Sequence, residues 1–423
     1  MSVFCDKISV NDVYLEVKSM HQEIKITADM YWVGGNDRRK SLFESVYPIP
    51  RGVSYNSYLI LDEKTVLLDT VDKDVSAVFL DGVEHLLSGR PLDYIIVNHM
   101  EPDHAATLGD LVMRHPEVRI VCNSKTADMI KQFFDFDADS RTHLVKEGDT
   151  LCTGRHIFTF IMAPLVHWPE VMVTYDMTEE TLYSADAFGS FGALNGNIFA
   201  DESTPDMSEY RRYYTNIVGK YGVQVKALLN KAQSLRISMI CPLHGLIWRK
   251  DIDNLIQKYS KWSTYEPEIN GVLIAYSSVY GNTQGAAEIV ANRLGEQGVK
   301  NIQMYDVSVT HPSYVVAEAF RYSHIVLATT TYNGGIFVTM ENLLLDLKAH
   351  NLQNRTVALI ENGTWAATAA GQMKNIISSM KGMNIIANPV TLKSSVKPEK
   401  RDELIALADA ICEALRQYRT IHC

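Results

Sequence analysis

One short segment restricts the fold of this chain more than any other. An apolar run at residues 95–97 leads directly into four possible metal ligands, which are His99, Glu101, Asp103 and His104. A short apolar run bounded by polar residues is typical of a buried strand, so we expect these side chains in the loop at the end of a strand. Two carboxylates held so close repel each other unless a cation compensates their charge. The segment therefore predicts a fold in which a strand end carries a metal site.

Three more candidate ligands each follow an apolar run further along the chain: His167 after residues 158–166, Asp186 after residues 181–185 and His244 after residues 237–243. Each has an ordinary explanation when taken alone. A histidine after a strand is more often a structural residue, and the chain has 13 histidines. An aspartate there is commonly part of a turn or a helix cap. The dense loop at residues 99–104 is the stronger indication, because isolated motif matches are often false.

The length of 423 residues predicts two domains, because a single core rarely grows that large. The pattern changes at residues 261–270, KWSTYEPEIN, where Pro267 and its polar neighbours predict a linker. We therefore expect one domain at residues 1–265 and a second at residues 266–423.

The two expected domains differ in their secondary structure. Before the linker we expect short strands and then mixed strands and helices, with a strand pair at residues 54–61 and 64–70. After the linker, strands and helices alternate. The expected strands are at residues 271–276, 324–329, 356–361 and 384–390, and the expected helices are at residues 284–294, 341–349 and 399–418. This alternation predicts an α/β domain with a parallel, doubly wound sheet.

The composition argues against several classes of protein. The net charge of −10 disfavours general binding to nucleic acid or anionic membranes, and no apolar run is long enough to span a bilayer. The N-terminus, MSVFCDKISVNDVYLEV, lacks the apolar core of a secretory signal. The cysteines form no C-x-x-C pair, which suits free thiols in a reducing cytoplasm and leaves no place for a rubredoxin-like or iron–sulfur module. They are Cys5, Cys122, Cys152, Cys241, Cys412 and Cys423.

The second part of the chain carries a hydroxyl-rich loop, SSVYGNT at residues 277–283, between an expected strand and an expected helix. Backbone N–H groups at a helix N-terminus bind anions, and the loop has no acidic side chain, so it predicts a phosphate site. The loop lacks the lysine of a P-loop, and the chain has no G-x-G-x-x-G motif of a dinucleotide-binding fold. An ordinary Ser/Thr helix cap explains the loop about equally well on its own.

Two further loops, at residues 329–337 and 361–371, also follow expected strands. Loops at the carboxyl ends of neighbouring parallel strands meet in one crevice. Tyr332 and Trp365 offer aromatic faces for a flat ring, although such rings are more often part of a core. The convergence of three loops is the stronger reason to expect a ligand there.

The run H-x-E-x-D-H, followed by His167, Asp186 and His244, resembles the ligand set of flavodiiron proteins. That family joins a metallo-β-lactamase-like domain to a flavodoxin-like domain, in the order expected here. Residues 30–60 also look like the N-terminal strands of the family, so the resemblance covers nearly the whole chain. It implies an α/β protein, with an N-terminal metallo-β-lactamase-like αββα sandwich followed by a flavodoxin-like doubly wound parallel sheet.

The same resemblance implies the roles of individual residues. One iron would be bound by His99, Glu101 and His167, the other by Asp103, His104 and His244, with Asp186 bridging them. FMN would bind with its phosphate at the first loop, at Ser277, Val279, Tyr280, Gly281, Asn282 and Thr283. The other two loops would flank the isoalloxazine, with Thr330, Thr331, Tyr332, Asn333, Gly334 and Gly335 in one and Asn362, Gly363, Thr364 and Trp365 in the other.

Glu101 bears on the choice of metal. The related dizinc hydrolases have H-x-H-x-D-H, with a histidine where this chain has Glu101. The resulting set of four imidazoles and three carboxylates is harder and more anionic, which favours iron or manganese over zinc, although ligand identity alone does not fix selectivity.

The resemblance implies an oxidoreductase, and our first hypothesis is four-electron reduction of O2 to water with electrons passed through FMN. Reduction of NO to N2O is the alternative within the same family. A dinuclear metallo-hydrolase fused to a flavin module is less favoured because of Glu101 and because hydrolysis has no use for electrons. An electron carrier with a degenerate first domain is less favoured because all seven ligand positions are filled. The resemblance also implies an external electron donor, either a rubredoxin-like protein or a flavoprotein reductase. It further implies a head-to-tail homodimer, with a homotetramer built as a dimer of dimers left open.

Overall fold

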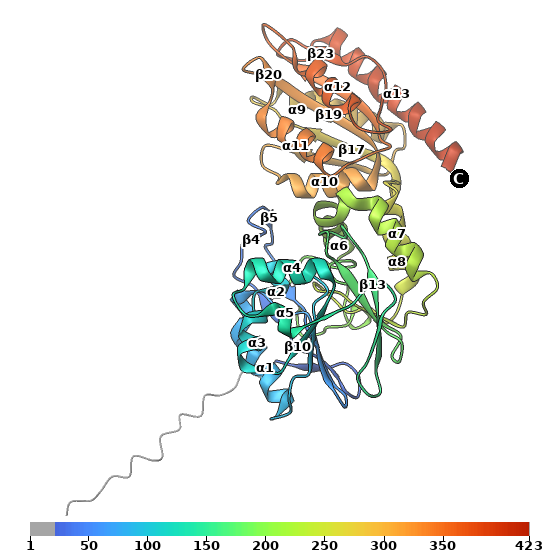
Figure 1. Ribbon diagram of the computed structural model, residues 1–423. Coiled ribbons are helices and arrows are strands. Elements are labelled where there is room, and N and C mark those ends of the chain that lie inside the picture. The colour runs from blue at the N-terminus through green and yellow to red at the C-terminus, as the bar shows by residue number, and fades with distance from the viewer. Residues whose placement is uncertain (1–21, 423) are drawn as a thin grey trace, which may run out of the picture.

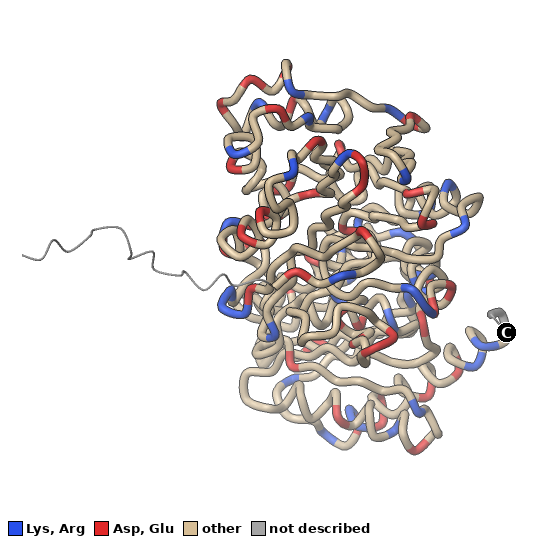
Figure 2. The backbone as a smooth tube through the Cα atoms, turned by 90° about the horizontal axis from the view of Figure 1, so that it is seen from below, with Lys and Arg blue, Asp and Glu red and all other residues tan. Residues whose placement is uncertain are grey.

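The computed structural model describes residues 22–422. The N-terminal segment searched for a secretory signal, together with Cys5 and Cys423, lies outside the described residues. Within residues 22–422 no helix combines the length and the hydropathy needed to cross a membrane. Figure 2 shows lysines and arginines interspersed with acidic residues along the chain.

The first part of the chain contains two sheets. The strands of the first, in spatial order, are β1 (Ile24–Lys25), β2 (Met30–Trp32), β7 (Tyr58–Leu61), β8 (Thr65–Leu68), β9 (Tyr94–Ile96), β10 (Arg119–Cys122) and β11 (Thr142–Leu144). The strands of the second are β12 (Thr150–Cys152), β13 (Ile157–Met162), β14 (Met172–Asp176), β15 (Thr181–Tyr183) and β16 (Met239–Cys241). The expected strand pair is confirmed in part, as the antiparallel hairpin β7–β8, in which Leu61 pairs with Thr65. The expected first strand at residues 54–61 is divided, because its start belongs to β6 (Val53–Tyr55), which pairs with β3 (Gly35–Asp37) in a separate two-stranded sheet.

Helices cover the outer faces of both sheets (Figure 1). Large aromatic and aliphatic side chains such as Trp32, Tyr58 and Phe158 fill the space between the sheets. Helices α1 (Ser76–Leu87), α3 (Leu108–Arg114) and α4 (Ser124–Phe133) lie on one side, and α7 (Gly222–Ala232) and α8 (Ile252–Ser263) lie on the other. The result is the expected αββα sandwich, which places the ends of strands from both sheets at one edge.

The second part is a parallel sheet in the order β18 (Ile302–Asp306), β17 (Ile269–Tyr276), β19 (Tyr322–Tyr332), β21 (Thr356–Asn362) and β22 (Asn384–Ile385). Two short strands extend it, β20 (Gly335–Ile336) on β19 and β23 (Val390–Leu392) on β21. Helices α9 (Asn282–Glu296) and α13 (Pro398–His422) pack on one face, and α10 (Pro312–Arg321), α11 (Val338–Ala349) and α12 (Ala369–Ser378) on the other. The expected doubly wound fold is confirmed, because side chains on alternate positions of each central strand are buried against opposite layers.

The structure corrects three details of the expected elements. The strand expected at residues 384–390 is split into β22 and β23, because Ala387 has a left-handed φ of 58° and Pro389 has no N–H to donate to a ladder. Strand β18 was not anticipated, since its side chains are only half-buried and lack a continuous apolar run. The linker is shorter than expected, because α8 continues to Ser263 and β17 begins at Ile269.

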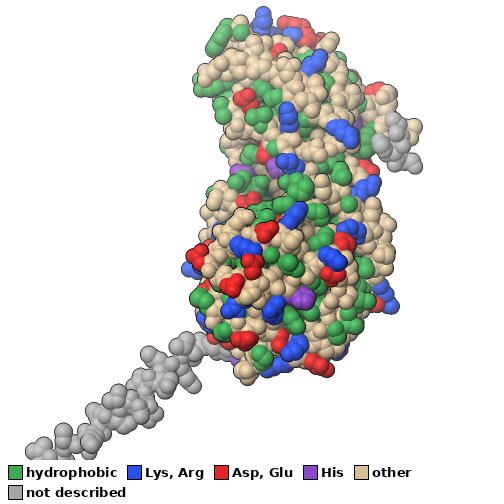
Figure 3. Space-filling model, in the orientation of Figure 1, with side chains coloured by type: hydrophobic (Ala, Val, Ile, Leu, Met, Phe, Trp, Pro, Cys, Tyr) green, Lys and Arg blue, Asp and Glu red, His purple; other side chains and the backbone are tan. Residues whose placement is uncertain are grey.

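Helix α6 (Met207–Tyr213) and the π-helical turn Tyr214–Val218 join the two parts. Arg211 is buried and contacts Glu318 at 2.8 Å and Glu268 at 3.2 Å. Arg212 donates to the carbonyl of Pro48 at 3.0 Å and to Oγ of Ser313 at 3.3 Å. Paired, hydrogen-bonded charges are tolerated in such a buried position, so α6 is fixed between the two parts. Figure 3 shows the two lobes and the hollow between them, where histidine side chains reach the surface.

Candidate metal centre

The loop after β9 places the first four candidate ligands at the edge of the sandwich. Asp69, just after β8, accepts hydrogen bonds from the backbone N–H groups of Asn98 at 2.7 Å and His99 at 3.2 Å, which fixes the start of the loop. The short helix α2 (Pro102–Ala105) then begins with a proline, whose fixed φ suits the first helical position. Asp103 and His104 are thereby held on one helical turn.

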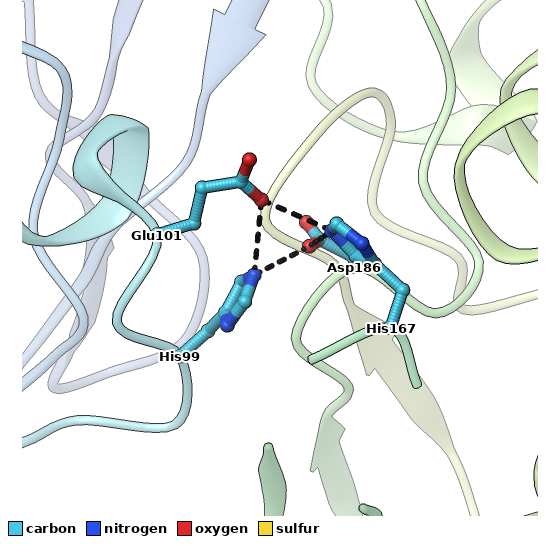
Figure 4. Close-up of side chains that lie close together, drawn as sticks. All are labelled: His99, Glu101, His167 and Asp186. Carbon is cyan, nitrogen blue, oxygen red and sulfur yellow. Dashed lines mark hydrogen bonds and ion pairs between the residues drawn. The ribbon is translucent and has the colours of Figure 1, made fainter. Parts of the chain in front are cut away.

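The other three candidates come from the second sheet, at the ends of β13, β15 and β16. His99, His104, Asp186 and His244 are each at most 1% exposed, and His167 and Asp103 are also buried. The ligand atoms form two groups, and within each group all atoms lie within 4.8 Å of one another. One group contains His99, Glu101, His167 and Asp186, and the other contains Asp103, His104 and His244. Figure 4 shows the first group, with its side chains pointing toward a common centre.

Asp186 lies between the two groups. Its Oδ2 atom is 3.1 Å from Nε2 of His99 and 3.2 Å from Nε2 of His167. Its Oδ1 atom is 3.2 Å from Nε2 of His104 and 3.5 Å from Nε2 of His244. Each oxygen therefore faces one group, which is the geometry of a carboxylate that bridges two cations.

Two further carboxylates complete the groups. Oε2 of Glu101 lies 3.2 Å from Nε2 of His99 and 3.0 Å from Nε2 of His167. Oδ2 of Asp103 lies 3.4 Å from Nε2 of His104 and 3.3 Å from Nε2 of His244. The structure thus brings together all seven residues singled out in the sequence, in the grouping that the resemblance implies.

Several buried oxygen atoms at the centre face ring nitrogens but have no hydrogen-bond partner among the described residues. Both carboxylate oxygens of Asp103 and of Asp186 are buried without a hydrogen-bond partner among the described residues, and such atoms cost free energy unless they are compensated. Nε2 of His104 faces Nε2 of His244 at 3.0 Å, although only one of two facing nitrogens can donate to the other. Two divalent cations with nitrogen and oxygen ligands would satisfy these atoms together, so the residues fit a dinuclear metal site.

Two of the imidazole rings are held in orientation by hydrogen bonds from Nδ1, the ring nitrogen that faces away from the centre. Nδ1 of His99 donates to Oε1 of Glu170 at 2.8 Å, and Nδ1 of His244 donates to the backbone carbonyl of Ser54 at 2.7 Å. Because both partners can only accept, Nδ1 carries the proton in each ring and the Nε2 lone pair faces the centre. Burial would raise the pKa of Glu170, but its hydrogen bonds from the His99 ring and from the backbone N–H of Met100 hold the pKa below its usual value. Sequence reasoning missed Glu170, three positions after His167; an acidic residue so close to a candidate ligand is the signal that was available.

Replacing Glu170 with glutamine is expected to weaken metal binding by about 10- to 100-fold. The amide oxygen still accepts from His99, so the ring keeps its orientation, but the negative charge that increases its basicity is lost. Titration of the metal-free protein with Fe(II) or Co(II) under anaerobic conditions measures the effect. The control is Glu147→Gln, an exposed glutamate that pairs with Lys231. Equal metal affinity in E170Q and E147Q would refute this role for Glu170.

An opening leads from the surface to the centre. A cavity of about 260 Å3 is lined by Glu101 and Asp103 together with charged residues that include Lys40, Glu44 and Asp72. The hairpin of β4 (Leu42–Phe43) and β5 (Tyr47–Pro48) borders this opening. We refer to it below as the charged opening.

Aromatic rings close the His244 side of the centre. The rings of Phe43 and Tyr213 lie 5.3 Å and 5.4 Å from the His244 ring. The hydroxyl of Tyr213 is buried and has no hydrogen-bond partner among the described residues. Burial raises the pKa of Tyr213, and the carboxylates of Asp186 and Asp103 raise it further, so the phenol keeps its proton. This residue was not singled out from the sequence, and it lies in helix α6, where all side chains from Glu209 to Tyr213 are buried.

The three loops expected to bind a ligand lie next to one another at the carboxyl edge of the second sheet. Oγ of Ser277 and Oγ1 of Thr329 are hydrogen-bonded at 2.7 Å, and Oγ1 of Thr330 donates to the carbonyl of Asn362 at 3.2 Å. A segment not anticipated from the sequence joins them, because Asn362 exchanges two hydrogen bonds with the backbone of Ser394, at 2.8 Å and 2.9 Å.

The loop at residues 277–283 leaves the start of a helix open. Helix α9 begins at Asn282, and its N-cap is Gly281, which makes no side-chain cap. The alternative of an ordinary Ser/Thr cap is therefore wrong. Val279 and Tyr280 are exposed and Thr283 is buried. The uncapped N–H groups of the first turn fit an anion.

The loops at residues 329–337 and 361–371 each carry an exposed aromatic ring. Trp365 is 94% exposed and Tyr332 is 47% exposed, so neither ring is part of a core. Asn333 and Gly334 form a tight turn with positive φ between β19 and β20. Oγ1 of Thr331 accepts from the backbone N–H of Thr368 at 3.0 Å, which leaves its hydroxyl hydrogen for another acceptor. The exposed rings and the open helix end fit a flat ring system that carries a phosphate.

Comparison with known proteins gives consistent matches. The model of the ODP family of β-lactamases matches residues 53–245. A nitric oxide reductase of Moorella thermoacetica is 30% identical over 88% of this chain and 93% of its own length. An anaerobic nitric oxide reductase flavorubredoxin of Aeromonas hydrophila is 29% identical over 89% of this chain and 76% of its own.

Two solved structures extend the likeness over both parts. The rubredoxin oxygen:oxidoreductase of Desulfovibrio gigas has a TM-score of 0.87 at 28% identity, and the match covers 94% of this chain and 99% of that one. The flavodiiron protein of Giardia intestinalis has a TM-score of 0.86 at 23% identity over 93% and 98% of the two chains, which supports the fold alone.

Proposed function

The chain belongs to the flavodiiron protein family of oxidoreductases, and we propose that its reaction is the reduction of O2 to water at a non-haem diiron site that receives electrons through FMN. The observation that carries this proposal is the position of Asp186, whose two oxygens each face one group of candidate ligands. A single buried carboxylate placed in this way suits a pair of ions and has little use in a site for one ion.

The proposed ligands follow from the two groups. His99, Glu101 and His167 would hold one iron, Asp103, His104 and His244 the other, and Asp186 both. When bound, the iron pair and FMN supply the electrons for the reaction. The anchored Nδ1 atoms of His99 and His244 keep the two Nε2 lone pairs directed at the ions. Tyr213 keeps a proton on a buried hydroxyl beside the carboxylates, where it is available as a donor.

We place the FMN phosphate at the open start of α9, with Ser277 and Val279–Thr283 around it. The isoalloxazine would lie between the loop at Thr330–Gly335 and the loop at Asn362–Trp365. The exposed ring of Trp365 is suited to stack on it. We also place the boundary between the two domains at residues 265 and 266, and the protein in the cytoplasm.

The flavin crevice and the metal centre are far apart within one chain, which supports a head-to-tail homodimer. The N-terminal end of β19 follows α10, whose Glu318 contacts Arg211 of the first domain, while the crevice is at the other end of β19. This strand has 11 residues, and at about 3.3 Å per residue it is about 35 Å long. Figure 1 shows β20 and β23 at the end of the sheet away from the first domain. A second copy would bring its flavin to the charged opening, and two such dimers would make the tetramer. Electrons would enter from a rubredoxin-like protein or a flavoprotein reductase.

Reduction of NO to N2O is the second candidate, and the names of the Moorella and Aeromonas relatives favour it. The experiment that separates the candidates begins with iron-loaded protein, in which iron and flavin are quantified. We expect close to two irons and one FMN per chain. Consumption of O2 and of NO is then measured separately after anaerobic reduction. Faster turnover of NO would reverse our ordering, zinc with hydrolytic activity would indicate a hydrolase, and FMN without metal an electron carrier.

A further inference from the structure

A second cavity lies near the candidate centre, and this one is apolar. It has a volume of about 270 Å3 and lies between β15, α7 and α8. Hydrocarbon side chains form most of its wall, among them Leu182, Phe188, Leu228, Leu229, Ile252 and Ile256. The first three of these are buried, whereas the polar wall residues Gln233 and Asp253 are exposed and mark its mouth.

The cavity ends one turn away from Asp186. Leu182 belongs to β15, the strand that leads to Asp186, and Phe188 follows Asp186 by two positions. The backbone N–H of Gly189 donates to the carbonyl of Asp186 at 3.1 Å, which closes a four-residue turn that contains Phe188. Such a turn spans less than about 7 Å between its end Cα atoms. Phe188 therefore belongs both to the wall of the cavity and to the turn that begins at Asp186, whose carboxylate faces both ligand groups.

Phe188 is held in place as a wall and does not fill the cavity. Its backbone N–H donates to the hydroxyl of Tyr259 at 2.6 Å, and its ring packs against the Tyr259 ring at 4.3 Å. The side chain is 2% exposed.

The two approaches to the centre differ in what they attract. The charged opening carries Lys40, Glu44 and Asp72 and holds water strongly. O2 and NO have little polarity, so they gain nothing from such groups and concentrate in apolar surroundings. Apolar protein cavities stay dry and bind small apolar guests such as xenon, and 270 Å3 far exceeds the space that a diatomic molecule needs.

We propose that the apolar cavity beside Phe188 is the chamber through which a diatomic gas substrate reaches the Asp186 side of the metal centre. The inference rests on the proposed function for the identity of the gas. It assigns the charged opening to electrons, protons and water. The separation of routes is useful in the proposed dimer, where the flavin of the second copy occupies the charged opening.

The cavity is tested first with xenon, which has the size and apolar character of the gases but no chemistry. Xenon pressurisation of crystals of the full-length protein is expected to place xenon between Leu182, Phe188 and Ile256. Ala232→Phe fills the cavity from α7 and is expected to remove the xenon. Asn230→Phe places the same ring on an exposed position of the same helix and is expected to retain it. If A232F does not fold, Ile256→Trp fills the cavity from α8.

The route is tested with the reduced, iron-loaded protein. Filling the cavity is expected to lower the second-order rate constant for reaction with O2 or NO by about fivefold, equivalent to a barrier raised by about 1 kcal/mol. Turnover at saturating gas, iron content and flavin content are expected to stay unchanged. If the wild type binds no xenon, the cavity does not hold small apolar guests and the proposal is refuted. If a variant has lost xenon but its second-order rate constant is unchanged, the gas substrate does not reach the centre through this cavity. Absence of iron and of turnover, with xenon still bound, instead refutes the proposed function and removes the route with it.

Discussion

Asp186→Asn is expected to lose both metal ions and to lower the rate of O2 consumption by about a thousandfold or more. Each oxygen of Asp186 faces one group of candidate ligands, at 3.1 to 3.5 Å from the ring nitrogens. Asparagine has the same shape, but it replaces one oxygen with an NH2 group that donates and cannot bind a cation. It also removes the negative charge that compensates two ions. One group therefore loses its shared ligand, and the charge balance of both is changed.

The control for this variant is Asp176→Asn. Asp176 is also buried and accepts from a histidine, since its Oδ2 atom lies 2.6 Å from Nδ1 of His156, but it belongs to neither ligand group. Metal content and O2 consumption are measured for both variants after identical loading with iron. D176N is expected to be less stable yet to keep its full metal content. If D186N retained two ions per chain, Asp186 would not be a bridging ligand.

The seven candidate ligands were predictable because each lies shortly after an apolar run, in the segment where a strand ends and polar residues begin. The contacts that orient these ligands in three dimensions were not predictable from the sequence. The contact of His99 with Glu170 joins positions 71 residues apart, and it depends on how the loop after β9 meets the segment after His167. A linear pattern carries no information on that register, so the role of Glu170 emerges only from the structure.

The hairpin beside the charged opening was hidden for a different reason. Glu44 and Ser45 occupy its turn with φ values of 49° and 58°, where a sequence reader expects Asn-Gly or Asp-Gly. Tertiary contacts overrode the local preference, since the adjacent Phe43 packs on the His244 ring. In the second domain the alternation of strands and helices was enough to predict the sheet and the crevice, because parallel strands leave few alternatives for the connecting loops.

Asn282→Asp is expected to weaken FMN binding by about a hundredfold without lowering the stability of the flavin-free protein. Asn282 is the first residue of α9 and is exposed at its uncapped start. A carboxylate there stands where we place the FMN phosphate, and repulsion between such charges costs about 3 kcal/mol near a protein surface. The same carboxylate interacts favourably with the helix dipole, by about 0.5 kcal/mol. FMN affinity is therefore expected to fall while the stability of the flavin-free protein does not. A misfolded variant would lose both, so the two measurements distinguish loss of a phosphate site from misfolding.

The matched control is Asn292→Asp, which puts the same charge on the same helix ten residues further along, about 15 Å away. FMN affinity is measured by the quenching of flavin fluorescence, and stability by thermal unfolding of the flavin-free protein. N292D is expected to bind FMN like the wild type. Increasing the ionic strength is expected to narrow the difference in affinity between N282D and the wild type, because exposed charges are screened. Equal affinity of N282D and N292D at low salt would place the phosphate elsewhere and would leave the open start of α9 without a ligand.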